Sequence, residues 1–186
     1  MGVSAAVRQA RVGHEPAPGA DLLRHYLRDL VYGANDGIIT TFAVVSGVAG
    51  ASLDARTVLI LGAANLLADG FSMGASNYLS IRSDEAVRHA RGEAISEPYP
   101  LRHGVATTAA FVVAGIVPLL PYVLVAPARR FAVAVAATLV TLFVVGALRS
   151  SVTALRWWKA GLEMLAVGAL AAAVSYAVGW LIAGLT

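Results

Sequence analysis

Residues 57–81 read TVLILGAANLLADGFSMGASNYLSI, an apolar stretch with a single charged side chain, Asp69, near its middle. A helix rises about 1.5 Å per residue, so this stretch is long enough to cross a hydrocarbon core about 30 Å thick. A carboxylate at that depth costs about 2.5–3.5 kcal/mol or more, and by default it marks an ion path, a proton relay or a counter-ion. The stretch therefore predicts a membrane-spanning helix that carries a functional acid.

Further apolar stretches lie on both sides of this one, at residues 37–53, 104–125, 131–148 and 164–184. The chain of 186 residues is 58% hydrophobic and only 13% charged, whereas soluble domains are about 25% charged. Its mean hydropathy is +0.72. This composition excludes an ordinary soluble enzyme and predicts an all-α membrane protein with five transmembrane helices.

The distribution of basic residues predicts how the chain lies in the membrane. If the N-terminus is cytoplasmic, only Arg56, Arg129 and Arg130 of the 14 basic residues fall on the opposite side. This asymmetry follows the positive-inside rule and predicts a cytoplasmic N-terminus with the C-terminus outside. It also explains the basic pI of about 9.6 without nucleic acid as a partner. We expect an integral protein of the plasma (inner) membrane of a prokaryote.

The chain divides into three parts. Residues 1–20 predict a flexible cytoplasmic tail. Residues 21–35 place apolar and charged side chains on opposite faces of a helix, which is typical of an amphipathic helix at the membrane interface. Residues 36–186 form the five-span domain, with a short cytoplasmic loop at 82–103, and Pro118 and Pro121 should kink or loosen its third span.

One face of the helix predicted over residues 57–81 is polar. At about 100° per residue, the following side chains project within about 100° of one another: Asn65, Asp69, Ser72, Met73, Ser76 and Ser80. A hydrated ion path is one interpretation, with Asn65, Ser72, Ser76 and Asn77 as lining residues. The alternative is a stripe of interhelical hydrogen bonds around a protonated Asp69. Gly70 and Gly74 lie on another side, with a spacing that lets a second helix approach closely.

Asp36 precedes the first apolar stretch and either caps that helix or acts as a ligand. The short connection after this stretch makes the first two spans antiparallel neighbours, which places Asp36 on the same helix pair as Asp69 and Met73. Carboxylate oxygens with one thioether suit Fe²⁺ or Mn²⁺ better than Mg²⁺ or Ca²⁺. A buried carboxyl group holds its proton more tightly than an exposed one, so Asp69 is also a candidate for exchanging a proton for a metal ion.

The segment between the second and third spans carries three glutamates and a histidine at a spacing of four: Glu85, His89, Glu93 and Glu97. On a helix they would share one face that collects divalent ions, and Glu163 at the start of the last span is a further candidate at the entrance. The alternative is a solvated helix with ordinary ion pairs. The absence of cysteine excludes thiolate ligands.

Two motifs resemble the vacuolar iron transporter family: DGIITTFAVVSG at residues 36–47, and ADGFSM at 68–73 followed by YLS at 78–80. The resemblance implies five spans per subunit, a homodimer, and a path between the subunits for Fe²⁺ or Mn²⁺ leaving the cytoplasm, coupled to protons. By matching position it implies that Asp36 and Met73 are ion ligands, with Asp69 close by. Many members have a long glutamate-rich region after the second span, here shortened to about 20 residues, and an acid where this chain has Asn77.

Two other classes of function compete with a transporter. An intramembrane aspartyl protease also uses a pair of acids. Here, however, Asp69 follows Leu67-Ala68 and not the Gly-x-Gly motif expected for such a protease. A non-transporting membrane scaffold would need no buried acid. We therefore expect a transporter for metal homeostasis and detoxification, with the metal as its substrate, no bound cofactor and no enzymatic activity.

Overall fold

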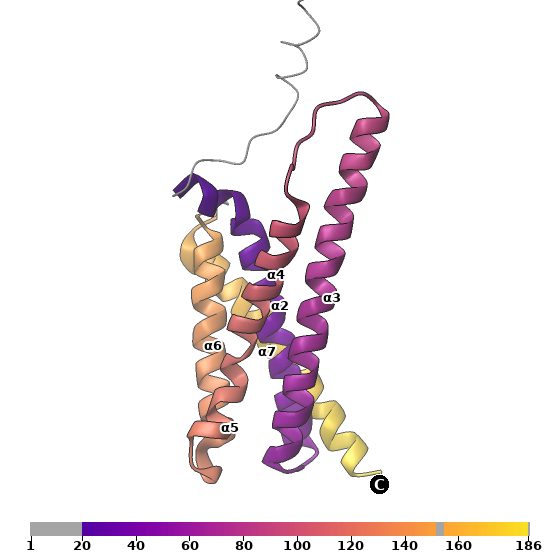
Figure 1. The fold of residues 1–186 in the computed structure, drawn as a ribbon. Helices are drawn as coiled ribbons and strands as arrows, with labels where there is room; N and C mark the ends of the chain where they lie inside the picture. The colour runs from indigo at the N-terminus through magenta and orange to yellow at the C-terminus, as the bar shows by residue number, and fades with distance from the viewer. Residues whose placement is uncertain (1–19, 152–154, 186) are drawn as a thin grey trace, which may run out of the picture.

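The computed structural model describes residues 20–151 and 155–185, most of which are helical (Figure 1). In chain order the helices are α2 (Ala20–Gly50), α3 (Ala55–Ala90), α4 (Pro100–Gly115), η1 (Val117–Leu119), α5 (Leu120–Leu124), η2 (Pro127–Arg129), α6 (Arg130–Arg149) and α7 (Trp157–Ala183). These described residues contain no β-strand, which confirms the predicted all-α class.

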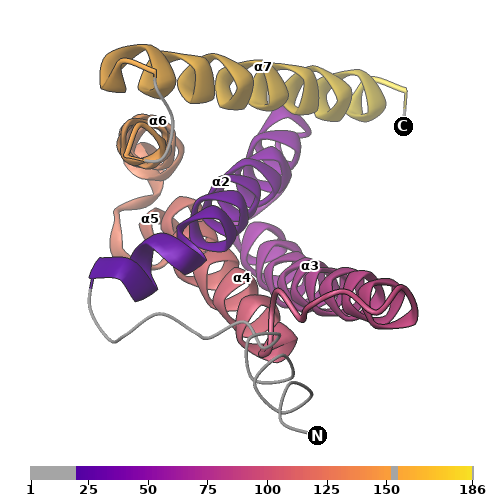
Figure 2. The ribbon, with the colours of Figure 1, turned by 90° about the horizontal axis from the view of Figure 1, so that it is seen from above.

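Helix α2 is the central helix of the bundle. It packs against α3, α4, α6 and α7, and the view from above shows it between α7 and α4 (Figure 2). The same view shows α6 end-on and α7 lengthwise, so α7 crosses the bundle at a steep angle to α6. Ile38, Thr41 and Val45 of α2 are fully buried. The neighbouring helices therefore shield much of α2 from lipid.

Four of the described helical segments are long and apolar enough to cross a membrane: Ala55–Ala90, Pro100–Leu124, Pro127–Arg149 and Trp157–Ala183. They contain most or all of the predicted stretches at 57–81, 104–125, 131–148 and 164–184. The chain is thus an integral membrane protein. The remaining predicted span, 37–53, falls largely within α2, which does not reach the same apolarity because polar residues such as Asn35 and Asp36 interrupt it.

The predicted interfacial helix and the predicted first span form one continuous helix, since α2 runs through residues 35 and 36 without a break. Asp36 therefore lies in the interior of α2 and is not its N-cap. Arg24 and Arg28 are exposed, as expected at an interface, but Asp29 is buried. The tail predicted over residues 1–20 lies outside the described residues, apart from Ala20.

A turn over residues 51–54 joins α2 to α3 and makes them antiparallel neighbours, as predicted. Asp54 caps α3, because its Oδ1 accepts hydrogen bonds from the backbone N–H of Thr57 at 2.8 Å and from the Thr57 hydroxyl at 3.0 Å. These hydrogen bonds lower the pKa of the Asp54 carboxyl from its ordinary value of 3.8. The cap satisfies a backbone donor that the first turn of α3 would otherwise leave unpaired.

Helix α3 continues past the stretch at 57–81, so much of the predicted loop at 82–103 is helical. The chain has no glycine or proline between Ile81 and Gly92 to interrupt the helix. Gly92 has a φ of 70°, a left-handed conformation that favours glycine and follows the end of α3. The non-helical part of the loop is residues 91–99.

The third predicted span loosens where its prolines lie, as expected. Helix α4 ends at Gly115, and the chain continues through the 3-10 turn η1 into the short helix α5. Pro118 lies in η1 and Pro121 in α5. Because proline lacks a backbone N–H and crowds the preceding turn, it disfavours a regular α-helix at this point.

Glycines allow α2 and α3 to approach α4 closely. A Cβ atom on Gly37 would overlap the backbone carbonyl oxygen of Phe111, and one on Gly74 would overlap the side chain of Thr108. Thr108 Oγ1 also donates a hydrogen bond to the Gly70 carbonyl oxygen at 3.0 Å. The close helix contact predicted for Gly70 and Gly74 is confirmed, with α4 as the second helix.

Replacing Gly37 with alanine should destabilise the bundle by about 1–3 kcal/mol, the usual effect of overpacking. The new methyl group would collide with a backbone atom of α4 that has no freedom to rotate away. Gly184→Ala is a matched control, because a Cβ atom there meets no neighbour closer than 3.6 Å. Thermal unfolding in detergent measures both variants: Gly37→Ala should lower the Tm and Gly184→Ala should not. Equal Tm values would contradict this packing.

Candidate functional site

Two carboxylates lie near each other in the middle of the bundle. Asp36 is on α2 and Asp69 is on α3, and both residues are half-buried. Their charges are close enough to repel one another. The sequence placed both acids on one helix pair, and the structure brings them together.

Met73 and Asn65 flank Asp69 on α3, each one helical turn away. Met73 is half-buried and packs against the core cluster that contains Phe42 and Leu66. Asn65 is also half-buried, and its Nδ2 has no hydrogen-bond partner within the described residues. An unpaired buried amide costs about 1–3 kcal/mol. This position is therefore suited to contact with water or with a polar substrate.

The serines of the predicted polar face lie on the surface of the chain. Ser72, Ser76 and Ser80 are exposed, whereas the other members of that face are half-buried. Asn77, the remaining predicted lining residue, is also half-buried. The face is therefore divided into an inner stripe and an exposed serine stripe.

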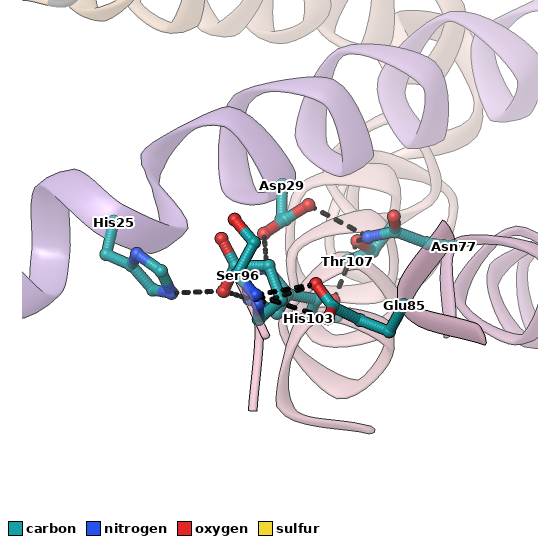
Figure 3. Close-up of polar contacts among 8 residues, drawn as sticks. His25, Asp29, Asn77, Glu85, Ser96, His103 and Thr107 are labelled. Atoms are coloured by element: carbon teal, nitrogen blue, oxygen red, sulfur yellow. Dashed lines mark hydrogen bonds and ion pairs between the residues drawn. The ribbon is translucent and has the colours of Figure 1, made fainter. Parts of the chain in front are cut away.

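A hydrogen-bond network joins α2, α3 and α4 at Asp29 (Figure 3). One carboxylate oxygen of Asp29, Oδ2, lies 2.6 Å from His103 Nδ1, and the other, Oδ1, accepts a hydrogen bond from Asn77 Nδ2 at 2.8 Å. Asn77 Nδ2 also donates to Thr107 Oγ1 at 2.8 Å, and the Thr107 hydroxyl donates to the His103 carbonyl oxygen at 2.9 Å. Asp29 and His103 are 9% and 5% exposed. Both oxygens of this buried carboxylate are thus engaged.

An outer cluster lies next to this network and consists of His25, Glu97 and His103. Glu97 Oε2 lies 3.1 Å from Nε2 of His25 and 3.1 Å from Nε2 of His103. One ligand atom from each of the three residues lies within 4.8 Å of the others. Imidazole and carboxylate groups are common ligands of transition metals, so these residues could hold a metal ion.

The network and the acid pair occupy successive levels of the same two helices. Asp36 lies about 10 Å along α2 from Asp29, and Asp69 lies about 12 Å along α3 from Asn77, at 1.5 Å per residue. Because α2 and α3 are antiparallel and Asn77 contacts Asp29, both helices present their next acid at nearly the same depth. The polar side chains therefore form a ladder from one end of the bundle to its middle.

A cavity of about 450 Å³ opens beside the outer cluster. Its lining includes the three cluster residues and Asp29, together with charged residues such as Arg28 and Asp84. The outer end of the ladder is therefore accessible from the end of the bundle that carries the loop at 91–99.

The acidic face predicted after the second span does not form on one helix. Glu85 and His89 lie on α3, but the helix ends at Ala90, so Glu93 and Glu97 belong to the loop. Of these residues, the structure places Glu97 in the outer cluster, and His89 and Glu93 are exposed.

Glu85 holds the loop in place. Its Oε1 accepts hydrogen bonds from the backbone N–H groups of Ser96 at 3.0 Å and Glu97 at 2.8 Å. Charge-assisted hydrogen bonds of this kind are stronger than neutral ones. Glu85 therefore positions the backbone of Glu97, whose side chain reaches the two histidines.

The other predicted collecting residues form ion pairs. Glu93 Oε2 lies 3.7 Å from Arg88 Nη1, and Glu163 Oε2 lies 2.7 Å from Arg149 Nη2. Exposed pairs of this type contribute about 0–1 kcal/mol. They match the alternative of a solvated surface with ordinary ion pairs.

His25, Asp29 and His103 were not predicted as site residues. All three residues lie outside the predicted apolar stretches. Outside a membrane span, a charged or polar side chain is common and does not by itself indicate a functional site. A signal was nevertheless present, because His25, Asp29 and Asp36 recur at a spacing that places them on one face of a helix.

Comparisons with known proteins match most of the chain. The family model described as the VIT family matches residues 27–97 and 86–180. Vacuolar iron transporter homolog 4 of Arabidopsis thaliana is 31% identical over 160 residues, which cover 81% of this chain and 81% of that protein. Vacuolar iron transporter 1 of Eucalyptus grandis is 25% identical over 208 residues, covering 81% of this chain and 84% of the relative.

A shorter and more similar match involves the vacuolar iron transporter of Toxoplasma gondii. It is 45% identical over 60 residues, which cover 32% of this chain and 20% of that protein. The chain thus spans about a fifth of this relative and about four fifths of the two plant proteins.

Replacing Glu85 with alanine should release the loop at 91–99. A hydrogen bond to a charged group contributes about 1.5–3 kcal/mol, so hydrogen exchange at the amides of Ser96 and Glu97 should accelerate by at least about tenfold. Glu93→Ala removes an acid from the same region and should leave the exchange rates of these amides unchanged. The Glu93 carboxylate forms an exposed ion pair with Arg88 at 3.7 Å, which is weak. Equal exchange rates in Glu85→Ala and the unmodified protein would contradict the role of Glu85.

Proposed function

Because the chain belongs to the VIT family, we propose that it is a transporter that exports Fe²⁺ or Mn²⁺ from the cytoplasm in exchange for protons. The motifs that contain Asp36 and Asp69 predicted this family, and the family match confirms the resemblance. The relatives reported above are named as vacuolar iron transporters or their homologs, in agreement with the prediction that the chain is not an enzyme. Its cellular role would be metal homeostasis and detoxification.

The observation that carries this proposal is the pair of acids, Asp36 and Asp69, within an apolar bundle. Two like charges repel strongly in a medium of low dielectric constant, and each is costly to bury alone. A divalent cation between them replaces the repulsion by attraction. Protons on the two carboxyl groups also remove it. Alternating occupation by a metal ion and by protons is the chemistry of an antiporter.

Met73 supports the choice of metal. Its thioether lies one helical turn from Asp69, and soft sulfur ligands favour transition metals over Mg²⁺ and Ca²⁺. Asn65, on the other side of Asp69, offers an unpaired amide to water or to the passing ion. Asp36, Asp69 and Met73 are thus the proposed ion ligands, and Asp69 is also a proposed proton carrier.

The direction of transport follows from the proposed orientation. The positive-inside asymmetry places the N-terminus, the outer cluster and the loop at 91–99 in the cytoplasm. Helix α2 would be the fifth span, because it lies at the centre of helices that are long and apolar enough to cross the membrane. We place the chain in the plasma membrane of a prokaryote. Export from the cytoplasm has the same sense there as transport into a vacuole.

Asp69→Asn and Met73→Ala should each lower the rate of metal transport by at least about tenfold, the effect of losing about 1.4 kcal/mol of binding to a path ligand. The measurement is Fe²⁺ and Mn²⁺ uptake into proteoliposomes with an imposed pH gradient. Asp54→Asn is the matched control, because it makes the same chemical change in an exposed helix cap. It should transport at the normal rate.

Several outcomes of this experiment would contradict the proposal. Unmodified protein that moves neither metal would favour the membrane scaffold. Uptake that ignores the pH gradient would exclude proton antiport. Full activity in both Asp69→Asn and Met73→Ala would remove these residues from the path.

A second copy of the chain is the proposed partner of the serine stripe on α3. Ser72 and Ser76 are exposed beside the half-buried Asp69, and a polar stripe on a membrane helix is better placed against protein or water than against lipid. A homodimer built on this face would put the ion path between the subunits.

Cysteine crosslinking tests the dimer, since the natural chain has no cysteine. Ser76→Cys should give a covalent dimer in native membranes when treated with a short bis-maleimide. Ala136→Cys, which is exposed on α6, should remain monomeric. Crosslinking of Ala136→Cys in place of Ser76→Cys would contradict the proposed interface.

A further inference from the structure

The outer cluster combines donor groups from three separate parts of the chain. His25 comes from α2 and His103 from α4 (Figure 3). Glu97 comes from the loop at 91–99. The side chain of His103 is 7% exposed, whereas those of His25 and Glu97 are 21% and 30% exposed. The cluster is therefore anchored at a buried histidine and open to the cavity at its other two members.

Asp29 determines which nitrogen of His103 faces Glu97. The Asp29 carboxylate lies 2.6 Å from Nδ1 and can only accept a hydrogen bond, so Nδ1 carries the proton of this contact. In the neutral ring, the Nε2 lone pair then faces Glu97. Asn77 occupies the second oxygen of Asp29 and restricts its rotation. A carboxylate behind a histidine in this way is the usual support of a metal-bound imidazole, since it orients the ring and makes it a better ligand.

The spacing in front of His103 requires a proton or a cation between the facing groups. A carboxylate oxygen and an imidazole lone pair are both acceptors, and they face each other at 3.1 Å. His25 approaches the same Glu97 oxygen at the same distance. A proton on the Glu97 carboxyl group, extra protons on the imidazoles, or a metal cation would each allow these groups to lie this close. For ligands about 2.1 Å from a metal, adjacent ligand atoms are separated by about 3.0–3.4 Å. Both distances from Glu97 agree with this separation, whereas the three ligand atoms together spread over 4.8 Å, so the two histidines would move closer to each other around a bound ion.

We propose that His25, Glu97 and His103 bind a divalent transition metal ion, with Asp29 as the residue that positions His103. Two histidines and one carboxylate are the ligand set of non-haem Fe²⁺ sites with open coordination positions. Mg²⁺ and Ca²⁺ prefer oxygen ligands, so the cluster discriminates against them. Its further role as the loading site at the cytoplasmic end of the ladder rests on the proposed function.

Direct binding to the purified full-length chain tests the site separately from transport. Anaerobic calorimetry with Fe²⁺ in excess Mg²⁺ is performed in the Asp69→Asn/Met73→Ala background, which removes proposed ligands in the middle of the bundle. His25→Gln and His103→Gln should each weaken Fe²⁺ binding by at least about 100-fold, and Asp29→Asn by about 10–100-fold. His25→Gln alters a partly exposed side chain and keeps the test valid if His103→Gln does not fold.

The rival interpretation is a purely structural latch, with protonated histidines bridging Asp29 and Glu97. In that case Fe²⁺ binding would be absent from the background chain or unchanged by His25→Gln and His103→Gln, and the proposal would be overturned. Binding that depends on His89 rather than His25 would also overturn it, since His89 lies outside the cluster. If the site binds Fe²⁺ as expected but proteoliposomes show no transport, only the proposed function fails.

Discussion

The high free energy of a charged carboxylate among apolar helices is the constraint on which the rest of this structure depends. The bundle meets it by placing α2, a long helix without a stretch as apolar as those of the four candidate spans, at the centre, in contact with helices on several sides. Gly37 makes this possible at the critical point. It follows Asp36 directly and lets α2 approach the backbone of α4. This close contact between α2 and α4 therefore lies next to one of the two acids, Asp36.

The chemistry of the ladder changes with depth. At the outer end, histidines and a carboxylate face a cavity. One level further in, both oxygens of Asp29 are engaged by neighbouring side chains. At the next level, the carboxylates of Asp36 and Asp69 are close enough to repel each other when both are ionised. Asn77 has a distinct part in this order, because its amide donates hydrogen bonds to both Asp29 and Thr107. An ionised acid at this position has no proton to donate and would add a second negative charge beside Asp29.

The short segment between α3 and α4 gives the bundle a compact end beside the outer cluster. Residues 91–99 are its non-helical part, and Glu85 fixes the backbone of Glu97 there. Many members of the family instead carry a long glutamate-rich region between these two helices. The outer cluster draws its imidazoles from α2 and α4, so its geometry depends on the crossing of two packed helices. Such a site is more rigid than one built on a loop alone.

The sequence by itself determined the helical class, the membrane environment, the family and the acids Asp36 and Asp69 on two neighbouring helices. These follow from local properties: the length of an apolar run, the transfer free energy of its residues, and the spacing that places Asp69 and Met73 on one helix face. Tertiary structure decided that residues 20–50 form one helix, that Glu93 and Glu97 leave the predicted acidic face, and that His25 meets His103. His25 and His103 are far apart in the chain, and their contact depends on how α2, α4 and the loop pack. The periodicity of a single segment does not predict such a contact.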